Sequence, residues 1–195
     1  MKSIAFFDFD GTIYKGDSML HFIKAVRGKR FLRRRLFLLS PYIVLLKLGV
    51  IDAQKTKEKL LRMAFGGYSS DQLSPYISKF NSKIDTRVYD KAKAKLASFK
   101  EKQTEICIVS ASLDLWLETW CNKRGYNLLC SEAELIDGHI TGKLKGKNCR
   151  GPEKARRILE AYNLKHYEKI YAFGNDSGDL EMIALANQPT ETLYQ

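Results

Sequence analysis

The stretch FFDFDGTIY, residues 6–14, places two carboxylates two positions apart at the end of an apolar run. Alternation along an extended chain directs Asp8 and Asp10 to one side and Phe9 to the other. Two carboxylates this close repel each other, and the pKa of one rises sharply unless a cation lies beside them. Magnesium fits this need because it takes hard oxygen ligands and keeps waters and substrate phosphate in its octahedron.

The same stretch suggests a division of labour between its two acids. One carboxylate can attack phosphorus to form an acyl phosphate, while the other handles protons. Gly11 lets the backbone turn tightly and present amide donors to a phosphoryl oxygen. The plainer interpretation, which stays open at this point, is a strand that ends in a solvated acidic turn.

Length and composition limit the classes of protein that need to be considered. The chain has 195 residues, of which 45% are hydrophobic and 28% charged, a balance typical of one folded domain or a core domain with an insertion. The net charge of +11 favours anionic partners, namely phosphorylated metabolites, nucleic acid or an acidic membrane surface. Four cysteines without metal-ligand spacing predict buried thiols in a reducing compartment. The acidic motif leaves no room for a signal peptide before it, so we expect a cytoplasmic protein.

The order of predicted elements indicates an α/β fold. Strand patterns at 2–8, 105–112, 127–132 and 169–174 alternate with helical patterns, and Asp137-Gly138 marks a hairpin within 133–144. Helices are expected at 113–123, 151–164 and 179–186, and a long helical block runs from Asp17 to about Leu96. Alternating strands and helices predict a mostly parallel sheet with helices on both faces, and the block predicts a helical cap inserted after the first strand.

Three further signals fall at strand ends or helix starts, where open parallel sheets bind ligands. Ser110 follows an apolar strand, Lys154 lies near the start of a helix, and Gly174 is followed by Asn175, Asp176 and Asp179. Each has a plainer meaning on its own: a capping serine, a solvated lysine and an acidic helix start. Their coincidence with the first motif is what favours a catalytic site.

In this order the motifs DFDGT, VSAS, CRGPEKARRI and AFGNDSGD resemble those of haloacid-dehalogenase-like (HAD) phosphohydrolases, over nearly the whole chain. Within them the chain is most similar to the phosphoserine-phosphatase-like group, subfamily IB. The resemblance implies a HAD-like Rossmannoid parallel sheet with an all-helical type C1 cap. We expect residues 1–16 and 85–195 to form the core domain and 17–84 the cap.

The resemblance also implies a role for each matching residue in a magnesium-dependent phosphatase. Asp8 matches the nucleophile, Asp10 the general acid and base, and Ser110 and Lys154 the positions that orient phosphate and nucleophile. The remaining substrate or phosphate contacts are expected at Gly11, Thr12, Ala111 and Asp17. Magnesium is expected at Asp8, at the main-chain carbonyl of Asp10, and at the motif after Gly174, where Asn175 replaces the usual Asp, so Asn175, Asp176 and Asp179 are all candidates.

The sequence predicts the substrate less precisely than it predicts the type of reaction. Phosphoserine phosphatases carry Glu at the position of Asp17, so recognition of an amino acid is in doubt and a small soluble phosphomonoester is the first expectation. The basic residues between Arg27 and Arg35 precede the apolar run Leu36–Val50. A basic cluster beside an apolar segment is typical of an interfacial helix, so a lipid-phosphate phosphatase at an anionic membrane surface, peripherally bound, is the alternative to a buried cap helix.

A non-catalytic anion- or nucleic-acid-binding protein is the alternative of another class. The sequence carries no RNA-binding signature, so nucleic acid is not expected as a partner. The oligomeric state is left open.

Overall fold

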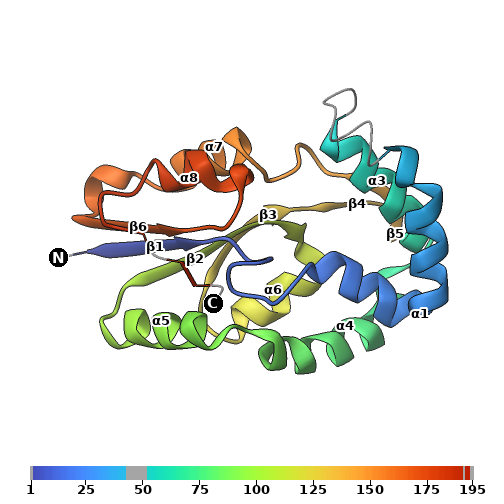
Figure 1. Ribbon diagram of the computed structural model, residues 1–195, viewed down its shortest axis with the longest axis horizontal. Helices are drawn as coiled ribbons and strands as arrows, with labels where there is room; N and C mark the ends of the chain where they lie inside the picture. Colours follow the sequence, from blue (N-terminus) through green and yellow to red (C-terminus); the bar gives the residue numbers. More distant parts are fainter. Residues whose placement is uncertain (1, 43–51, 191, 194–195) are drawn as a thin grey trace.

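The computed structural model describes residues 2–42, 52–190 and 192–193. At its centre lies a sheet of four parallel strands in the order β3–β2–β1–β6 (Figure 1). The strands are β1 (Ser3–Phe7), β2 (Glu105–Leu113), β3 (Asn127–Ser131) and β6 (Lys169–Phe173). The first strand therefore lies between two strands that come much later in the chain. The parallel α/β sheet predicted from the sequence is confirmed.

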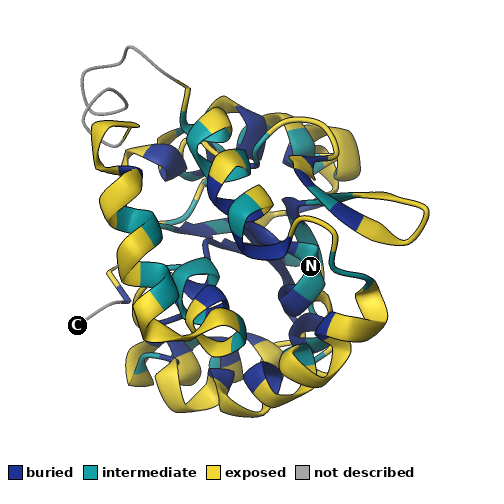
Figure 2. Ribbon diagram, turned by 90° about the vertical axis from the view of Figure 1, so that its right-hand side faces the viewer, coloured by how far each residue is buried: buried dark blue, intermediate teal, exposed yellow. Residues whose placement is uncertain are grey.

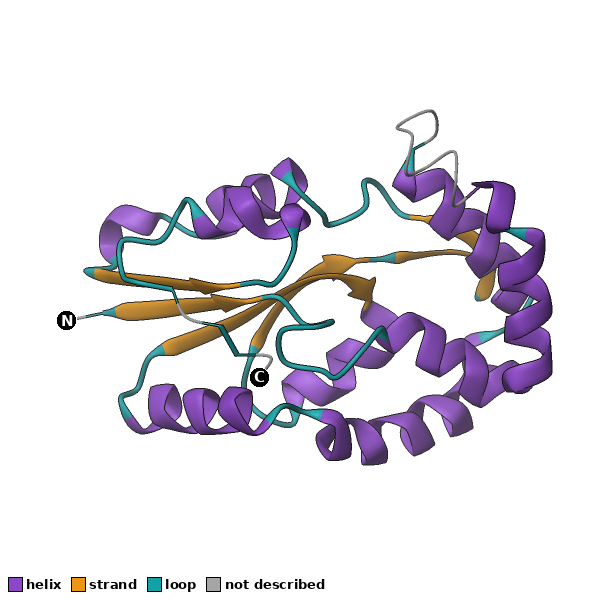
Figure 3. Cartoon of the chain, viewed as in Figure 1, coloured by secondary structure: helices purple, strands orange, loops and turns teal. Residues whose placement is uncertain are grey.

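Helices cover both faces of this sheet because β1 is apolar on both sides. Ala5 and Phe7 belong to the core beneath α5 (Asp90–Glu101) and α6 (Asp114–Asn122), whereas Ile4 and Phe6 belong to the core beneath α7 (Pro152–Ala161) and α8 (Leu180–Ile183). Figures 1 and 3 show the two helical layers on opposite sides of the strands. The strands are buried and the outer helix faces exposed, as Figure 2 shows.

The last predicted helix is shorter in the structure than in the prediction. The two helices on the second face are α7 (Pro152–Ala161) and α8 (Leu180–Ile183). The sequence pattern predicted that the last helix would run to residue 186. Instead the chain turns toward the sheet, where the Asn187 amide donates to the Ile170 carbonyl at 3.0 Å and its side chain accepts from the Ile170 amide at 2.9 Å. Pairing with the edge of β6 replaces the last turn of the helix.

Among the described residues between β1 and α5, three α-helices form the far end of the molecule in Figure 1. They are α1 (Ser18–Leu38), α3 (Ala53–Phe65) and α4 (Ser70–Ile84). Asp17 and Asp52 accept hydrogen bonds from the first turns of α1 and α3. The amino-terminal cap of α4 is Ser69, which forms a reciprocal capping box with Gln72.

The basic and apolar segment of α1 is only partly buried. Gly28 has φ +83 and interrupts α1, after which the chain resumes as a helix. Beyond it Phe37 is 78% exposed and Leu38 58% exposed, while Leu39 is buried. The rest of the apolar run, 43–50, lies outside the described residues. Among those that are described, no helix is long and apolar enough to cross a bilayer.

The predicted hairpin forms and packs on the inserted helices. Strands β4 (Ala133–Ile136) and β5 (His139–Leu144) are antiparallel, with positive φ at both Asp137 and Gly138. The Gly67 amide donates to the Ile140 carbonyl at 2.9 Å, which ties the end of α3 to β5. The division into a core (1–16 and 85–195) and a cap (17–84) stays a prediction, and the hairpin is one of several parts of the expected core that contact the expected cap.

Gly142 tests how closely this hairpin approaches α3. A Cβ at Gly142 would lie 2.3 Å from the Arg62 Cα, so Gly142→Ala should push the two elements apart. We expect Gly142→Ala to lower the free energy of unfolding, measured by urea denaturation, by about 1–3 kcal/mol more than the strain of a positive φ alone would lower it. The matched control is Gly146→Ala, which has a similar φ of +88 but no atom within 4 Å of its added Cβ. Equal destabilisation by the two substitutions would contradict the tight contact.

Candidate active site

The turn after β1 carries the two acids of the first motif. The Asp8 amide donates to the Phe173 carbonyl at 2.8 Å, which holds this turn against the end of β6. Gly11 has φ +80, and a Cβ there would lie 2.3 Å from the side-chain nitrogen of Asn175. Only glycine meets both requirements, so the turn bearing Asp8 and Asp10 can lie directly against the loop that bears Asn175.

Lys154 joins the first and last motifs through its ammonium group. Its Nζ lies 2.6 Å from Asp8 Oδ1 and 2.6 Å from Asp179 Oδ1, and all three side chains are buried. Burial opposes the positive charge, but the two carboxylates outweigh it and raise the pKa of Lys154. Burial raises the pKa of Asp8 to about 6, with the positive charge of Lys154 acting in the opposite direction. One ammonium thus holds two buried acids together at the sheet edge.

Asp10 is held by hydrogen bonds from two serines. The Ser18 amide donates to its Oδ1 at 2.8 Å, and the Ser112 hydroxyl donates to its Oδ2 at 2.5 Å. The Trp116 indole donates to the Ser18 hydroxyl at 3.1 Å, which ties this arrangement to the core. Burial, and next the negative charge of Asp17, raise the pKa of Asp10 to about 7. A carboxyl group with this pKa can give or take a proton near neutral pH.

The two aspartates after Gly174 accept hydrogen bonds from the backbone amides of their own loop. Asp179 Oδ2 accepts from the amides of Asn175 and Asp176, at 2.9 and 3.2 Å. Asp176 accepts from the Gly178 amide at 2.6 Å and pairs with Arg150 at 3.1 Å. These bonds shape the loop, and they occupy oxygens of both carboxylates.

Asn175 lies beside the nucleophile candidate. The Thr12 hydroxyl is 3.3 Å from Asn175 Oδ1 and 3.2 Å from Asp8 Oδ2, and its single proton can serve only one of them at a time. Within the described part of the chain, no group of three or more His, Cys, Asp or Glu side chains is arranged to hold a metal ion. Magnesium does not need such a group, since one or two carboxylates with carbonyl, water and phosphate oxygens suffice. The oxygens of Asp8 and Asn175 fit that donor set.

Ser110 lies at the end of the apolar part of β2 and is buried. Its hydroxyl oxygen accepts from the Ser112 amide at 3.0 Å, which leaves its own proton available to donate. The Ala111 carbonyl of the same strand accepts from the Lys57 ammonium, which comes from α3. The carboxyl end of β2 is therefore held both by its own backbone and by the inserted helices.

A hollow of about 460 Å³ collects these groups at the carboxyl ends of the strands. Every predicted site residue except Thr12 lines it, and Thr12 is buried next to Asp8. The lining residues that the sequence pattern did not predict are Gly16, Tyr89 and Arg150. Arg150 stands four residues before Lys154 in the quoted motif, a proximity that could have suggested it. Nothing in the sequence pattern distinguishes Tyr89 from the other aromatic residues of the chain.

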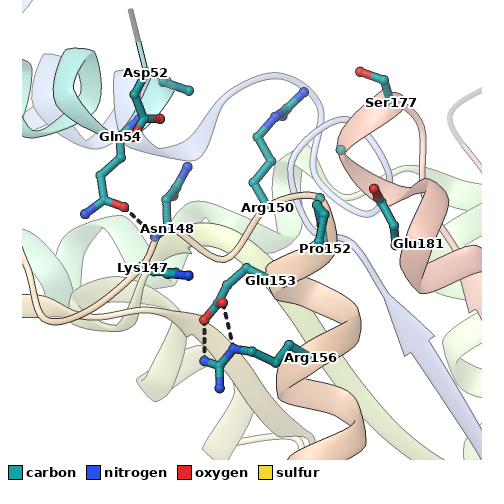
Figure 4. A pocket seen from close by; sticks show the side chains of 13 residues that line it. Asp52, Gln54, Lys147, Asn148, Arg150, Pro152, Glu153, Arg156, Ser177 and Glu181 are labelled. Atoms are coloured by element: carbon teal, nitrogen blue, oxygen red, sulfur yellow. Dashed lines mark hydrogen bonds and ion pairs between the residues drawn. The ribbon is translucent and has the colours of Figure 1, made fainter.

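A larger hollow of about 720 Å³ shares Arg150 with this one (Figure 4). Figure 4 shows Glu153 paired with Arg156 and Gln54 bonded to Asn148 at its walls. Among its charged side chains Glu153 pairs with Arg156, and neither acid of the first motif lines it. The chemistry is therefore better placed in the smaller hollow, despite the difference in volume.

Known proteins are similar to this chain over most of its length. The family model of the haloacid dehalogenase-like hydrolases matches residues 5–184. Protein CicA of Caulobacter vibrioides is 30% identical over 97% of this chain and 85% of its own length. A Bordetella pertussis protein of unknown function has a TM-score of 0.83 at 18% identity, covering 97% of this chain and 89% of the other. A phosphoserine phosphatase solved as a phospho-aspartyl intermediate analogue has a TM-score of 0.67 at 14% identity, covering 95% and 83%.

The chain belongs to the haloacid dehalogenase-like hydrolase family. The family model and the relative at 30% identity establish this, and the more distant structures share the fold. The expectation of a HAD-like hydrolase is confirmed.

Proposed function

We propose that this protein is a magnesium-dependent phosphatase that hydrolyses a phosphomonoester through an aspartyl-phosphate at Asp8. The observation that carries the proposal is the buried contact of Lys154 with Asp8, because it fixes one carboxylate at the strand end beside a second acid, Asp10, with a raised pKa. The phospho-aspartyl analogue of the structurally similar phosphoserine phosphatase supports the same chemistry. Family membership favours a hydrolase over the non-catalytic binding protein.

The first step transfers the phosphoryl group to the protein. The Asp8 carboxylate attacks phosphorus, the bond from phosphorus to the ester oxygen breaks, and Asp10 gives its proton to the departing oxygen. With a pKa of about 7, Asp10 is protonated in a large fraction of molecules at neutral pH. Lys154 orients the nucleophile and offsets the negative charge that the phosphoryl group brings.

The second step returns the protein to its starting state. Asp10, now a carboxylate, takes a proton from water as the water oxygen attacks phosphorus. The bond between phosphorus and Asp8 breaks, inorganic phosphate leaves, and both acids regain their original forms. Phosphorus is attacked first by the positioned Asp8 carboxylate and then by a water that Asp10 activates. These two attacks replace a direct attack of bulk water on the anionic ester.

Phosphate would be held by donors at the ends of β1 and β2. The Ser110 hydroxyl has its proton free, because its oxygen accepts from the Ser112 amide. We assign further contacts to the backbone at Gly11, Thr12 and Ala111, and a contact with the leaving group to Asp17.

Magnesium would bind at Asp8, at the main-chain carbonyl of Asp10 and at Asn175. When bound, the ion neutralises phosphoryl charge and helps to align the phosphoryl group for attack. Asn175 is preferred to Asp176 because the latter already pairs with Arg150 and caps its own loop. Asp179 supports the site indirectly by binding Lys154 and the loop amides.

Substitution of the nucleophile tests this proposal. We expect Asp8→Asn to lower turnover of p-nitrophenyl phosphate by at least about 10³-fold, because an amide cannot form the acyl phosphate. Chelation with EDTA should abolish wild-type activity and added magnesium should restore it. Asp90→Asn, on the exposed start of α5, is the matched control and should keep full activity. Retained turnover in a folded Asp8→Asn protein would contradict the proposal.

A lipid-borne phosphate is a second candidate substrate, favoured by the surface of α1. Phe37 and Leu38 are exposed, and Arg33 and Arg34 on the same helix are exposed as well. Apolar side chains beside arginines are suited to the headgroup region of an anionic membrane. This candidate keeps the chemistry at Asp8 and changes only where the substrate is presented.

Vesicle binding separates the two candidates. If the substrate is a lipid, the protein should sediment with phosphatidylserine-containing vesicles and not with pure phosphatidylcholine vesicles. The double variant Phe37→Ser/Leu38→Ser should then weaken binding by roughly tenfold or more. Ile136→Ser/Leu159→Ser changes two exposed apolar residues elsewhere and serves as the control. Absence of binding to either vesicle by the wild-type protein would rule out the membrane-surface candidate.

A further inference from the structure

A second hollow opens from the catalytic one on the side of the inserted helices. It measures about 450 Å³ and shares Asp10, Asp17, Ala111 and Arg150 with the catalytic hollow. Met19, Ala53, Lys57, Ser112 and Asn148 complete its lining. Asp10 stands at the boundary between the two hollows. An ester oxygen protonated by Asp10 would therefore have its attached group directed into the second hollow, which we call the leaving-group pocket; this step rests on the proposed function.

Lys57 is the unusual member of the leaving-group pocket. Its side chain comes from α3, and its ammonium donates to the Ala111 carbonyl and, at 2.9 Å, to Asn148 Oδ1. Both acceptors are neutral, and an ammonium has three N–H groups. The two bonds therefore leave one donor unused among the described residues. Burial lowers the pKa of Lys57 to about 8, which reflects how far the ammonium is removed from water.

The other cations of the two hollows already have counter-ions. Lys154 binds Asp8 and Asp179, and Arg150 pairs with Asp176. No carboxylate of the described residues comes within ion-pair distance of the Lys57 ammonium. A half-buried ammonium without a carboxylate partner is only partly stabilised, so its position beside an open pocket favours an anionic ligand.

The two nearby acids of the leaving-group pocket do not supply that counter-ion. Asp10 has both of its carboxylate oxygens engaged by Ser18 and Ser112. Asp17 is exposed and caps α1 through the Leu20 amide. The leaving-group pocket therefore offers two hydrogen-bond donors to a ligand, namely the remaining N–H of the Lys57 ammonium and the side-chain amide of Asn148.

We propose that Lys57 recognises a second anionic group on the substrate, carried by the part of the molecule that leaves with the ester oxygen. The substrate class is then a phosphomonoester with a carboxylate or a second phosphate a few bonds from the ester. Both groups present oxygens that accept from an ammonium, and both provide the counter-ion that Lys57 lacks. The inserted helices thereby choose the substrate, while the ends of the strands perform the chemistry.

A matched series of esters tests this assignment. Ethyl phosphate, phosphoglycolate and phosphoethanolamine each carry one phosphomonoester and end in a methyl, carboxylate or ammonium group. Ethane-1,2-diol bisphosphate carries two equivalent phosphomonoesters, so its kcat/KM is halved for the comparison and its other phosphate is the second anionic group. We expect the wild-type protein to prefer at least one of the anionic esters to ethyl phosphate by about tenfold or more in kcat/KM, and to disfavour phosphoethanolamine. The member that is preferred distinguishes a carboxylate from a phosphate ligand.

Variants of α3 then assign the preference to one residue. Lys57→Met should reduce the ratio of anionic to ethyl ester by about tenfold, mostly through KM, and Lys57→Arg should retain part of it. Lys55→Met removes an exposed lysine of the same helix and should leave the ratio unchanged. The inference is overturned if the wild-type protein shows no preference for either anionic ester. It is also overturned if Lys57→Met slows all esters in the same proportion, which a merely structural bond to the Ala111 carbonyl would produce.

Binding measurements keep this test separate from the catalytic proposal. Calorimetric titration of Asp8→Asn protein with the same esters reports the preference without turnover, and Asp8→Asn/Lys57→Met should lose it. A protein that binds phosphoglycolate or the bisphosphate preferentially but hydrolyses none of the series would retain the Lys57 assignment and refute the phosphatase. Hydrolysis of all four esters at equal efficiency would support the phosphatase and refute the Lys57 assignment.

Discussion

The site depends on one buried ammonium shared by two buried carboxylates. Lys154 reaches from the start of α7 to Asp8 at the end of β1 and to Asp179 after β6. Removing one partner of such a group leaves an uncompensated charge in the interior, which lowers the free energy of unfolding by roughly several kcal/mol. The contact therefore ties together three segments far apart in the sequence, and it also fixes the rotamer of the carboxylate that we assign as nucleophile.

Around that contact, glycines determine how closely the loops approach. A side chain at Gly11 would strike Asn175, and one at Gly174 would meet Asp179 at 2.4 Å. The catalytic hollow is small because these loops touch, and Thr12 can lie between Asp8 and Asn175 for the same reason. The leaving-group pocket differs in origin, since one of its walls comes from α3. Chemistry and substrate choice would thus be built by different parts of the chain.

Much of the fold could be predicted because its signals are local. An apolar run followed by DFDGT predicted a buried strand with acids at its end, and Asp137-Gly138 predicted a hairpin, which forms with both residues at positive φ. The extent of the last helix could not be predicted, because Asn187 pairs with Ile170 across the sheet. Lys57 was missed for a similar reason. It alternates with Lys55 and Lys59 in AQKTKEK, and only the packing of α3 shows which lysine reaches Ala111.

The most direct measurement is a crystal structure of the wild-type protein soaked with magnesium and beryllium fluoride, a mimic of the aspartyl-phosphate. Our account predicts a tetrahedral beryllium fluoride group bonded to the Asp8 carboxylate, with a magnesium ion next to it contacting Asn175 and the Asp10 carbonyl. An ordered site with no adduct at Asp8, or with the adduct on another residue, would contradict it.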